Sequence, residues 1–441
     1  MKKIELLSPA GTLKNMRYAF AYGADAIYAG QPRYSLRVRN NDFLEDNLAI
    51  GIDEAHKLGK KFYLTSNIMP HNSKIKTFVN DMEPVIAMKP DALIMADPGL
   101  IMMVRETWPE MPVHLSVQAN TVNYVSVKFW QSVGVERIIL SRELSLDEIA
   151  EIRQQCPDME LEVFVHGALC IAYSGRCLLS GYFNHRDPNQ GTCTNACRWE
   201  YKTTPAEQNA EGVYKPVTSN MGDQRNESSE QVMFIEEKGR PGEMMPVEED
   251  EHGTYIMNSK DLRAVEHVHR LVEIGVDSLK IEGRTKSHYY VSRTAQSYKQ
   301  AINDAVSGKE FNPELLGVLE NLANRGYTDG FYKRHHTHEY QNYMQGNSVN
   351  RQQQFVGEVT HYDKATGLAD IDVKNKILVG DRLELVQPSG NKEIILDSMQ
   401  DMNGNTMKEA PGGGYKVRIP LPESMAELGL IARFIDTPIA T

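Results

Sequence analysis

The sequence has no long hydrophobic run. Hydrophobic residues make up 41% of its 441 positions, but the apolar stretches, such as residues 92–95 and 137–140, are only as long as a strand. A membrane-spanning helix needs roughly 20 consecutive apolar residues, so such a helix is excluded. Residues 1–4 lead directly into a strand-like segment and leave no room for the apolar core of a signal peptide. We therefore expect a cytoplasmic protein.

The sequence also lacks an excess of positive charge and several familiar catalytic motifs. Its formal net charge is -11 at pH 7. This value excludes the positive potential over the whole surface that a nonspecific nucleic-acid binder carries, although it permits a local basic patch. The strings HExxH, GxSxG and GxxxxGK(S/T) are absent. The usual marks of zinc proteases, serine hydrolases and P-loop enzymes are therefore missing.

Short apolar runs alternate with helix-period stretches over about the first 290 residues, a pattern typical of strand-helix units around a parallel sheet. The nine runs are residues 4–7, 26–29, 62–65, 92–95, 113–117, 138–140, 161–165, 255–257 and 278–281. We predict an α/β fold in which eight of them close a (β/α)8-type barrel over residues 1–290, with one run outside the ring. A doubly wound sheet is the alternative, but no GxGxxG pattern follows the first run.

Polar or charged residues follow several of these runs, at the positions where barrel strands would end. Because the carboxyl ends of barrel strands surround the active site, we expect substrate to bind there. Arginine side chains can pair bidentately with phosphates or carboxylates, although a solvated loop or internal ion pairing would also explain such charges. The candidate substrate-binding residues are Arg33, Arg37, Arg39, Asn67, Asp97, Gln118, Lys280 and Arg284.

The remaining chain divides into three further parts. Residues 203–251 are rich in Glu, Gln, Asn, Ser and Gly, which predicts an insertion on the loop side of the barrel. Residues 291–352 are predicted to form a helical arm and connector. The helix period over residues 287–322 places one buried face at Tyr290, Val291, Ala295, Tyr298, Ala301 and Ile302.

Residues 353–441 have a different texture, with short alternating strands separated by turn signals. Strands are expected at residues 355–360, 368–373, 382–386, 393–397 and 415–419. Closely spaced strands of this kind predict a small antiparallel β-barrel. We expect this second domain to be a candidate RNA-binding domain.

Four of the five cysteines lie within one short segment: Cys170, Cys177, Cys193 and Cys197. Thiolates repel one another, and soft metals offset this cost by coordinating sulfur. Four such ligands suit an iron-sulfur cluster or a tetrahedral zinc ion. Only the last two cysteines have the tight spacing of a structural zinc site, which favours the cluster. Zinc and idle or catalytic thiols remain alternatives.

Three residues near this segment or at a strand end are the candidate catalytic groups. His166 and Glu162 lie in or just beyond the run at residues 161–165, and Arg142 follows the run at residues 138–140. Gly167 would let the backbone approach a bulky inorganic core closely. A nucleophilic pair of His166 and Cys170 is an alternative, but it would not require the other three cysteines.

Several segments resemble the collagenase-like peptidase family of unassigned mechanism, peptidase family U32. They are Glu-Val-Phe-Val-His-Gly-Ala-Leu-Cys at residues 162–170, Ser-Gly-Arg-Cys-Leu-Leu-Ser at 174–180, Leu-Ser-Pro-Ala-Gly at 7–11 and Lys-Ile-Glu-Gly-Arg at 280–284. The resemblance covers nearly the whole chain. Residues 30–41 and 189–199 are most similar to the branch of this family that makes 5-hydroxyuridine at the wobble position of tRNA.

The resemblance implies an oxidoreductase that hydroxylates C5 of uridine in tRNA without molecular oxygen. It implies prephenate as co-substrate and hydroxyl source, a 4Fe-4S cluster on the four cysteines, and iron-sulfur assembly machinery as a partner besides tRNA. Asn67, Asp97 and Gln118 would then read the edge of the uracil base. A collagenase-like peptidase and a non-catalytic RNA-binding factor are the alternative functions.

Overall fold

The computed structural model describes most of the chain. It covers residues 3–36, 42–170, 172–173, 260–324, 326–333, 353–421 and 428–435, and the backbone of six strands between residues 201 and 254. No helix in this described part combines the length and the apolar character needed to cross a membrane.

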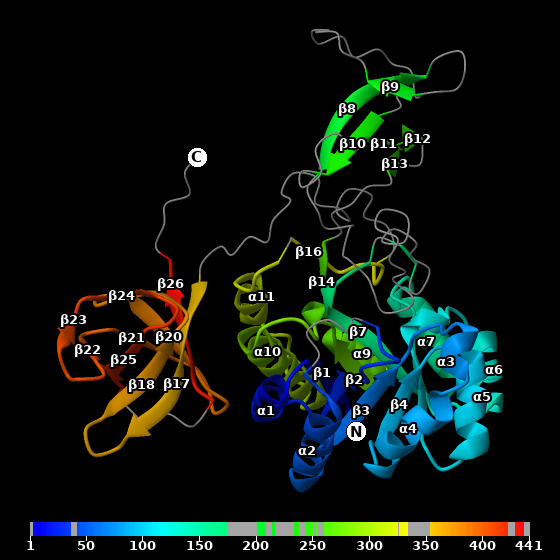
Figure 1. Cartoon of the computed structure of the whole chain (residues 1–441), viewed down its shortest axis with the longest axis horizontal. Helices are drawn as coiled ribbons and strands as arrows, with labels where there is room; N and C mark the ends of the chain where they lie inside the picture. Colours follow the sequence, from blue (N-terminus) through cyan, green and yellow to red (C-terminus); the bar gives the residue numbers. More distant parts are fainter. Residues whose placement is uncertain are drawn as a thin grey trace.

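Eight parallel strands form a closed barrel, as predicted (Figure 1). Strand β15 pairs in parallel with both β1 and β7, which closes the ring. The strands are β1 (Glu5–Pro9), β2 (Ala26–Gly30), β3 (Lys61–Ser66), β4 (Ala92–Met95), β5 (Val113–Leu115), β6 (Arg137–Ile139), β7 (Glu160–Ala168) and β15 (Ser278–Ile281). Eight of the nine apolar runs therefore build the ring. The ninth, residues 255–257, lies outside the described residues.

Helices surround this ring. They are α1 (Leu13–Ala21), α2 (Glu45–Lys57), α3 (Asn72–Ile75), α4 (Phe78–Ala87), α5 (Pro98–Thr107), α6 (Tyr124–Ser132), α7 (Leu146–Gln155), α9 (Val268–Ile274) and α10 (His288–Val306). All residues of β2 and β4 are buried, because the helices cover the outer face while side chains fill the interior. Side-chain caps mark the starts of α1, α5, α6, α7 and α10. At α7, Ser145 and Glu148 form a reciprocal capping box.

Helix α10 belongs to the barrel layer. It packs against α1, α9 and β1, so the domain boundary expected at residue 290 falls inside a barrel helix. Its six predicted core residues are all buried, which confirms the expected face. Helix α11 (Glu314–Glu320) follows and packs on α10.

Two short strands extend the wall beyond the end of β7. Strand β14 (Asp261–Arg263) pairs antiparallel with residues 166–168, and β16 (Tyr327–Thr328) pairs in parallel with β14. Both strands lie at the carboxyl end of β7, the end of a barrel where active sites form.

The predicted insertion contains a small antiparallel sheet of its own, formed by β8 (Tyr201–Gln208), β9 (Tyr214–Pro216), β10 (Met233–Glu237) and β11 (Met244–Val247). Strands β12 (Glu249–Asp250) and β13 (Gly253–Thr254) form a separate pair. In Figure 1 these strands lie beyond the end of the barrel that carries β14 and β16.

The C-terminal region is a curled antiparallel sheet. Its eight strands run in the order β21-β20-β26-β17-β18-β25-β22-β23, and β19 pairs with β24 beside them. The strands are β17 (Gln353–Asp363), β18 (Leu368–Val373), β19 (Asn375–Leu378), β20 (Arg382–Val386), β21 (Lys392–Ile395), β22 (Met399–Asp401), β23 (Thr406–Met407), β24 (Glu409–Gly412), β25 (Lys416–Pro420) and β26 (Leu430–Phe434). Among the described residues the end strands do not pair with each other, so the expected small barrel is a half-barrel.

Buried polar contacts attach this sheet to the barrel. The guanidinium of Arg293 on α10 is 1% exposed and bonds both carboxylate oxygens of Glu384 on β20, at 3.1 and 2.9 Å. The hydroxyl of Tyr22, the residue after α1, lies 2.8 Å from the carbonyl oxygen of Val386. Phe355 of β17 stacks on Tyr289 with ring centroids 4.7 Å apart. Desolvated contacts of this kind fix the orientation of two domains.

Candidate active site at the mouth of the barrel

A buried ion-pair network fills the lower part of the barrel interior. Arg137 Nη1 lies 2.6 Å from Glu5 Oε1 and 3.2 Å from Glu162 Oε2. Lys280 Nζ lies 2.8 Å from the other oxygen of Glu162, whose side chain is fully buried. Each carboxylate oxygen of Glu162 is therefore ion-paired, one with Arg137 and the other with Lys280. This arrangement suits Glu162 to positioning Lys280, and its catalytic role stays a prediction.

Lys280 connects this network to the upper part of the interior. Its Nζ lies 4.4 Å from the centroid of the Tyr28 ring and 5.4 Å from that of Phe164. Burial lowers the pKa of Lys280, and the nearby Glu162 carboxylate opposes this effect. Contact with the two ring faces stabilises the ammonium where water is excluded.

Arg142 lies above the same Phe164 ring. Its Cζ is 3.8 Å from the ring centroid, and its Nη2 donates to Glu282 Oε2 at 3.2 Å. Arg142 follows β6 and Glu282 follows β15, so closure of the barrel brings two strand ends together as predicted. The guanidinium lies flat on an aromatic platform, which restricts its orientation.

A second group of polar residues joins the ends of β3 and β5. Asn67 Oδ1 accepts from the Leu36 N–H at 3.1 Å, and its Nδ2 donates to Ser116 Oγ and Gln118 Oε1 at 3.2 and 3.1 Å. Arg284 Nη1 donates to Thr65 Oγ1 at 3.1 Å, and its Nη2 donates to the Leu36 carbonyl. These contacts tie the chain after β2 to the barrel mouth.

Gln118 keeps hydrogen-bonding groups available. Both of its described contacts, from Asn67 and from the Ser116 hydroxyl, go to its carbonyl oxygen. This fixes the orientation of the amide and leaves the two N–H donors of Nε2 without a partner among the described residues. Donors held in this way suit the carbonyl oxygens of a uracil base.

Asp97 and Arg33 lie in different surroundings. Asp97 caps α5 by accepting from the Leu100 N–H at 2.9 Å. Arg33 is exposed and pairs with Asp81 at 2.6 Å. The structure does not bring either residue into the contacts that join Asn67 with Gln118 or Arg142 with Glu282. Arg37 and Arg39 lie outside the described residues.

His166 is buried among three tyrosine rings, from Tyr290 and Tyr298 of α10 and Tyr327 of β16, with centroids 5.3 to 5.7 Å away. Burial lowers the pKa of His166 to about 3, helped by the charges of Lys286 and Arg263. The imidazole is therefore neutral at physiological pH.

The tautomer of His166 follows from its neighbours. The Tyr298 hydroxyl donates to the Val165 carbonyl at 2.7 Å and accepts from the Ala264 N–H at 3.2 Å. His166 Nδ1 lies 3.3 Å from the same hydroxyl oxygen and is therefore its donor. Nε2 keeps the lone pair and lies 3.4 Å from the Tyr327 hydroxyl, which donates its one proton to the Leu319 carbonyl at 3.1 Å. Nε2 is thus only weakly hydrogen-bonded, and the low pKa makes it a poor proton acceptor at neutral pH.

Of the four clustered cysteines, only Cys170 is described. It is exposed and lies two residues beyond the end of β7, on the mouth side of the barrel. Cys177, Cys193 and Cys197 lie outside the described residues, so the proposed ligand set stays a prediction. Cys156 is buried, in agreement with its separation from the other four in sequence.

Sequence reasoning missed two features. Tyr28 and Phe164 form the aromatic platform under the cations. Phe164 could have been found, since it shares the period-two phase of Glu162.

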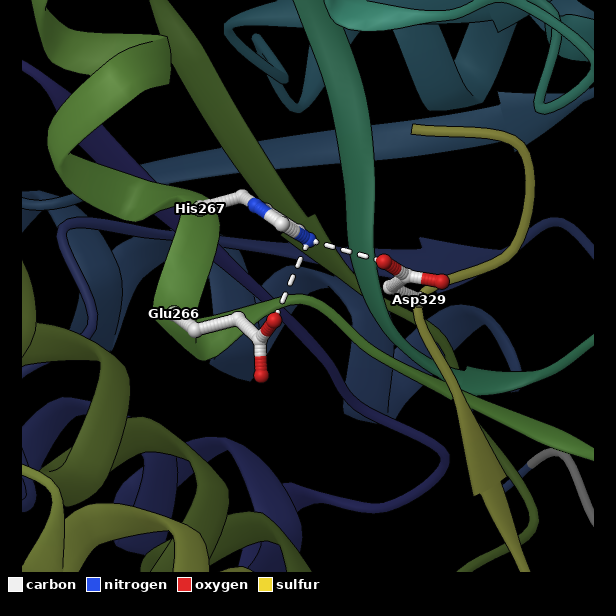
Figure 2. A group of neighbouring side chains, drawn as sticks. All are labelled: Glu266, His267 and Asp329. Carbon is white, nitrogen blue, oxygen red and sulfur yellow. Dashed lines mark hydrogen bonds and ion pairs between the residues drawn. The ribbon is translucent and has the colours of Figure 1, made fainter. Parts of the chain in front are cut away.

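The second missed feature is a cluster of Glu266, His267 and Asp329, shown in Figure 2. His267 Nε2 lies 3.2 Å from Asp329 and 3.5 Å from Glu266. Lys333 Nζ lies 3.0 Å from Glu266 and 4.0 Å from Asp329. The Lys333 ammonium contacts both carboxylates and offsets part of their charge, so we interpret this cluster as an ion-pair contact and not as a metal site.

Comparison with known proteins agrees with this architecture. The sequence model described as Peptidase family U32 matches residues 11–342, and that of the Peptidase family U32 C-terminal domain matches residues 351–433. A protein of Escherichia coli (strain K12) named tRNA hydroxylation protein P is 62% identical over 436 residues, which cover 96% of this chain and 95% of that protein. The protein of the same name from Haemophilus influenzae is 59% identical over 435 residues, 96% of this chain and 94% of its own length. A protein of Porphyromonas gingivalis named collagenase is 25% identical over 447 residues, 98% of this chain and 97% of its own length. The chain therefore belongs to peptidase family U32.

Proposed function

We propose that this protein is a tRNA hydroxylase that forms 5-hydroxyuridine at the wobble position. The observation that carries the proposal is the similarity to two proteins named tRNA hydroxylation protein P, at 62% and 59% identity across both the barrel and the C-terminal sheet. The reaction proposed is independent of molecular oxygen and uses prephenate as the hydroxyl source.

The chemistry of the barrel mouth supports this proposal. Gln118 presents amide donors for the carbonyl oxygens of a uracil base, and Arg142 presents a guanidinium on the Phe164 ring. A base must leave its stack to reach such a site, and single-stranded anticodon loops allow this at low cost. The C-terminal sheet, which is fixed to α10, would hold the remainder of the tRNA.

We further propose that Cys170, Cys177, Cys193 and Cys197 hold a 4Fe-4S cluster near the mouth. Four thiolates in one segment are the donor set that such clusters use, and Cys170 follows β7 directly at this end of the barrel. A bound cluster would supply one-electron transfer to the reaction. Iron and sulfide analysis of protein purified without oxygen tests this assignment. A Cys177→Ala variant is expected to lose the iron, whereas Cys156→Ala is expected to keep it.

Nucleoside analysis of tRNA tests the function. A deletion strain grown without oxygen is expected to lack 5-hydroxyuridine derivatives, and the wild-type gene is expected to restore them. Unchanged amounts in the deletion strain would contradict the proposal. Protein purified without oxygen is expected to leave gelatin uncleaved. Cleavage of gelatin that is lost in Cys170→Ala would instead support the peptidase function suggested by the relative named collagenase.

A further inference from the structure

Arg142 is a mouth cation with unused hydrogen-bonding capacity. Among the described residues its guanidinium has one hydrogen-bonded partner, Glu282, although the group carries five N–H donors. None of its nitrogens is among the buried side-chain atoms that lack a partner in the described part of the chain. The unused donors therefore face space that solvent reaches, while the side chain as a whole is only 12% exposed.

Arg142 was predicted as a catalytic residue, and the other described cations of the predicted site already have firm partners. Lys280 pairs with Glu162 at 2.8 Å, and Arg33 pairs with Asp81 at 2.6 Å. Arg284 donates to Thr65 and to the Leu36 carbonyl. Arg142 is thus the residue of this set best placed to accept an anion without breaking an existing contact.

The surroundings of Arg142 determine which anion fits. The Phe164 ring covers one face of the guanidinium, so a ligand must bind along its edge in the guanidinium plane. Lys280 lies over the same ring and adds a second positive charge. We propose that Arg142 receives the carboxylate of a small organic anion at the barrel mouth, with Lys280 providing charge behind it. The inference rests on the proposed function, in which that anion is prephenate.

The nearby glutamates disfavour phosphate at this position. Glu282 occupies one edge of Arg142, and Glu162 lies against Lys280. Both carboxylates repel a doubly charged phosphate more strongly than a singly charged carboxylate group. Inorganic phosphate should therefore bind Arg142 more weakly than a carboxylate does.

Calorimetric titration of the full-length protein with prephenate, in the absence of tRNA, tests this inference. Arg142→Met is expected to weaken binding by roughly tenfold to a hundredfold, the usual effect of losing a hydrogen bond to a charged group. Arg142→Lys keeps the positive charge but loses the planar guanidinium that can donate two parallel hydrogen bonds. Its prephenate affinity is expected to lie between that of the wild type and that of Arg142→Met. Circular dichroism would confirm that each variant is folded.

Arg382→Met is the matched control. Arg382 also lies over an aromatic ring, Phe434, at 4.2 Å and also bonds one glutamate, Glu393, but it belongs to the C-terminal sheet. Its prephenate affinity is expected to equal that of the wild type. Equal affinities for wild type and both Arg142 variants would overturn the inference, as would tighter binding of inorganic phosphate than of prephenate, or no binding of prephenate by the wild type.

Failure of the proposed function is recognised separately. If prephenate binding depends on Arg142 but the deletion strain keeps its 5-hydroxyuridine, the tRNA function is wrong and the carboxylate site stands. If the deletion strain loses the modified nucleoside but Arg142 variants bind prephenate normally, the function stands and the site is wrong.

Discussion

At the scale of single residues, burial and hydrogen bonding decide what each titratable group can do. His166 and Glu162 both lie in β7, yet their surroundings differ. Glu162 is held between two cations, whereas His166 is held neutral among tyrosines. The carboxylate of Glu162 is suited to positioning its two cations. An imidazole with a pKa of about 3 is a weak base at neutral pH, so the catalytic role of His166 stays a prediction.

The low pKa of His166 predicts a pH-dependent loss of stability. Its folded-state pKa of about 3 lies below the unfolded value, so the unfolded chain binds the proton more readily at mildly acidic pH. The stabilising effect is complete above pH ~6.5 and decreases as the pH falls toward 3. At pH 5 the loss is about 2 kcal/mol, given 1.4 kcal/mol per pH unit.

Urea unfolding of the wild type and of His166→Asn at pH 7.5 and pH 5 measures this effect. The difference in unfolding free energy between the two proteins is expected to shrink at the lower pH, because only the wild type has this histidine to protonate. A difference that stays constant between the two pH values would show that His166 is not held neutral by burial.

Gln118 is expected to affect tRNA and not the small co-substrate. Replacing Gln118 with Ala removes the available amide donors, so kcat/KM for tRNA should fall about tenfold, the effect of one or two hydrogen bonds. Prephenate affinity should not change, since Gln118 belongs to the contacts of Asn67 and not to those of Arg142. Steady-state hydroxylation assays with tRNA and calorimetry with prephenate measure the two effects. Loss of prephenate binding in this variant would show that Gln118 and Arg142 belong to one binding site and not to two.

At the scale of elements, the end of β7 is the most constrained part of the site. Gly167 has a φ of +103°, and a Cβ at this position would lie 2.4 Å from the Glu282 carbonyl oxygen. The group that approaches the Gly167 backbone in the described part of the chain is the residue after β15, and the expected approach of an inorganic core stays a prediction. The same contact helps to place Glu282 beside Arg142.

Gly167→Ala is therefore expected to destabilise the protein more than an ordinary glycine substitution. Gly275→Ala is the matched control, because Gly275 also has positive φ, +85°, but an added Cβ would meet nothing within 4 Å. We expect about 1 kcal/mol of destabilisation at Gly275, from backbone strain alone, and at least about 3 kcal/mol at Gly167. Thermal unfolding compares them. Equal losses would show that β15 can move away from β7 without cost.

Elements were easier to predict from the sequence than contacts between them. Residues 368–373 and 382–386 are strands with the expected bounds, because each alternates apolar and polar residues between turn signals. Strand β14 was missed, since a three-residue strand with two charges has no such pattern and exists only through pairing with β7. The role of Asp97 as the N-cap of α5 could have been predicted from Pro98, because proline is favoured at the first position of a helix. The contact of Arg142 with Glu282 could not be predicted from the sequence. It depends on the pairing of β15 with β7, and the insertion separates these two strands in the sequence.

At the scale of the whole molecule, the proposed function requires the C-terminal sheet to keep a fixed orientation on the barrel. Arg293 is central to this attachment, because its buried guanidinium bonds Glu384 directly and Gln353 also bonds that carboxylate. Losing one member of a buried pair leaves the other charge without compensation.

Arg293→Met is expected to lower the free energy of unfolding by about 3 to 5 kcal/mol. It should also weaken tRNA binding while prephenate affinity stays near the wild-type value, since the barrel mouth is built by other residues. Arg382→Met, which breaks the exposed pair with Glu393, should cost at most about 1 kcal/mol. Thermal unfolding and filter binding of tRNA provide the measurements. Unimpaired tRNA binding by a folded Arg293 variant would show that the orientation of the sheet is unimportant.

The antiparallel pairing of β7 with β14 determines how the segment between these two strands is attached to the barrel. Ala168 and Asp261 are direct neighbours in that ladder, so residues 169–260 leave the barrel and return to it at a single point. A segment attached in this way can be exchanged, lengthened or shortened between homologues while the ring beneath it keeps its hydrogen bonds. A change in the length of this segment therefore need not disturb the pairing of Ala168 with Asp261.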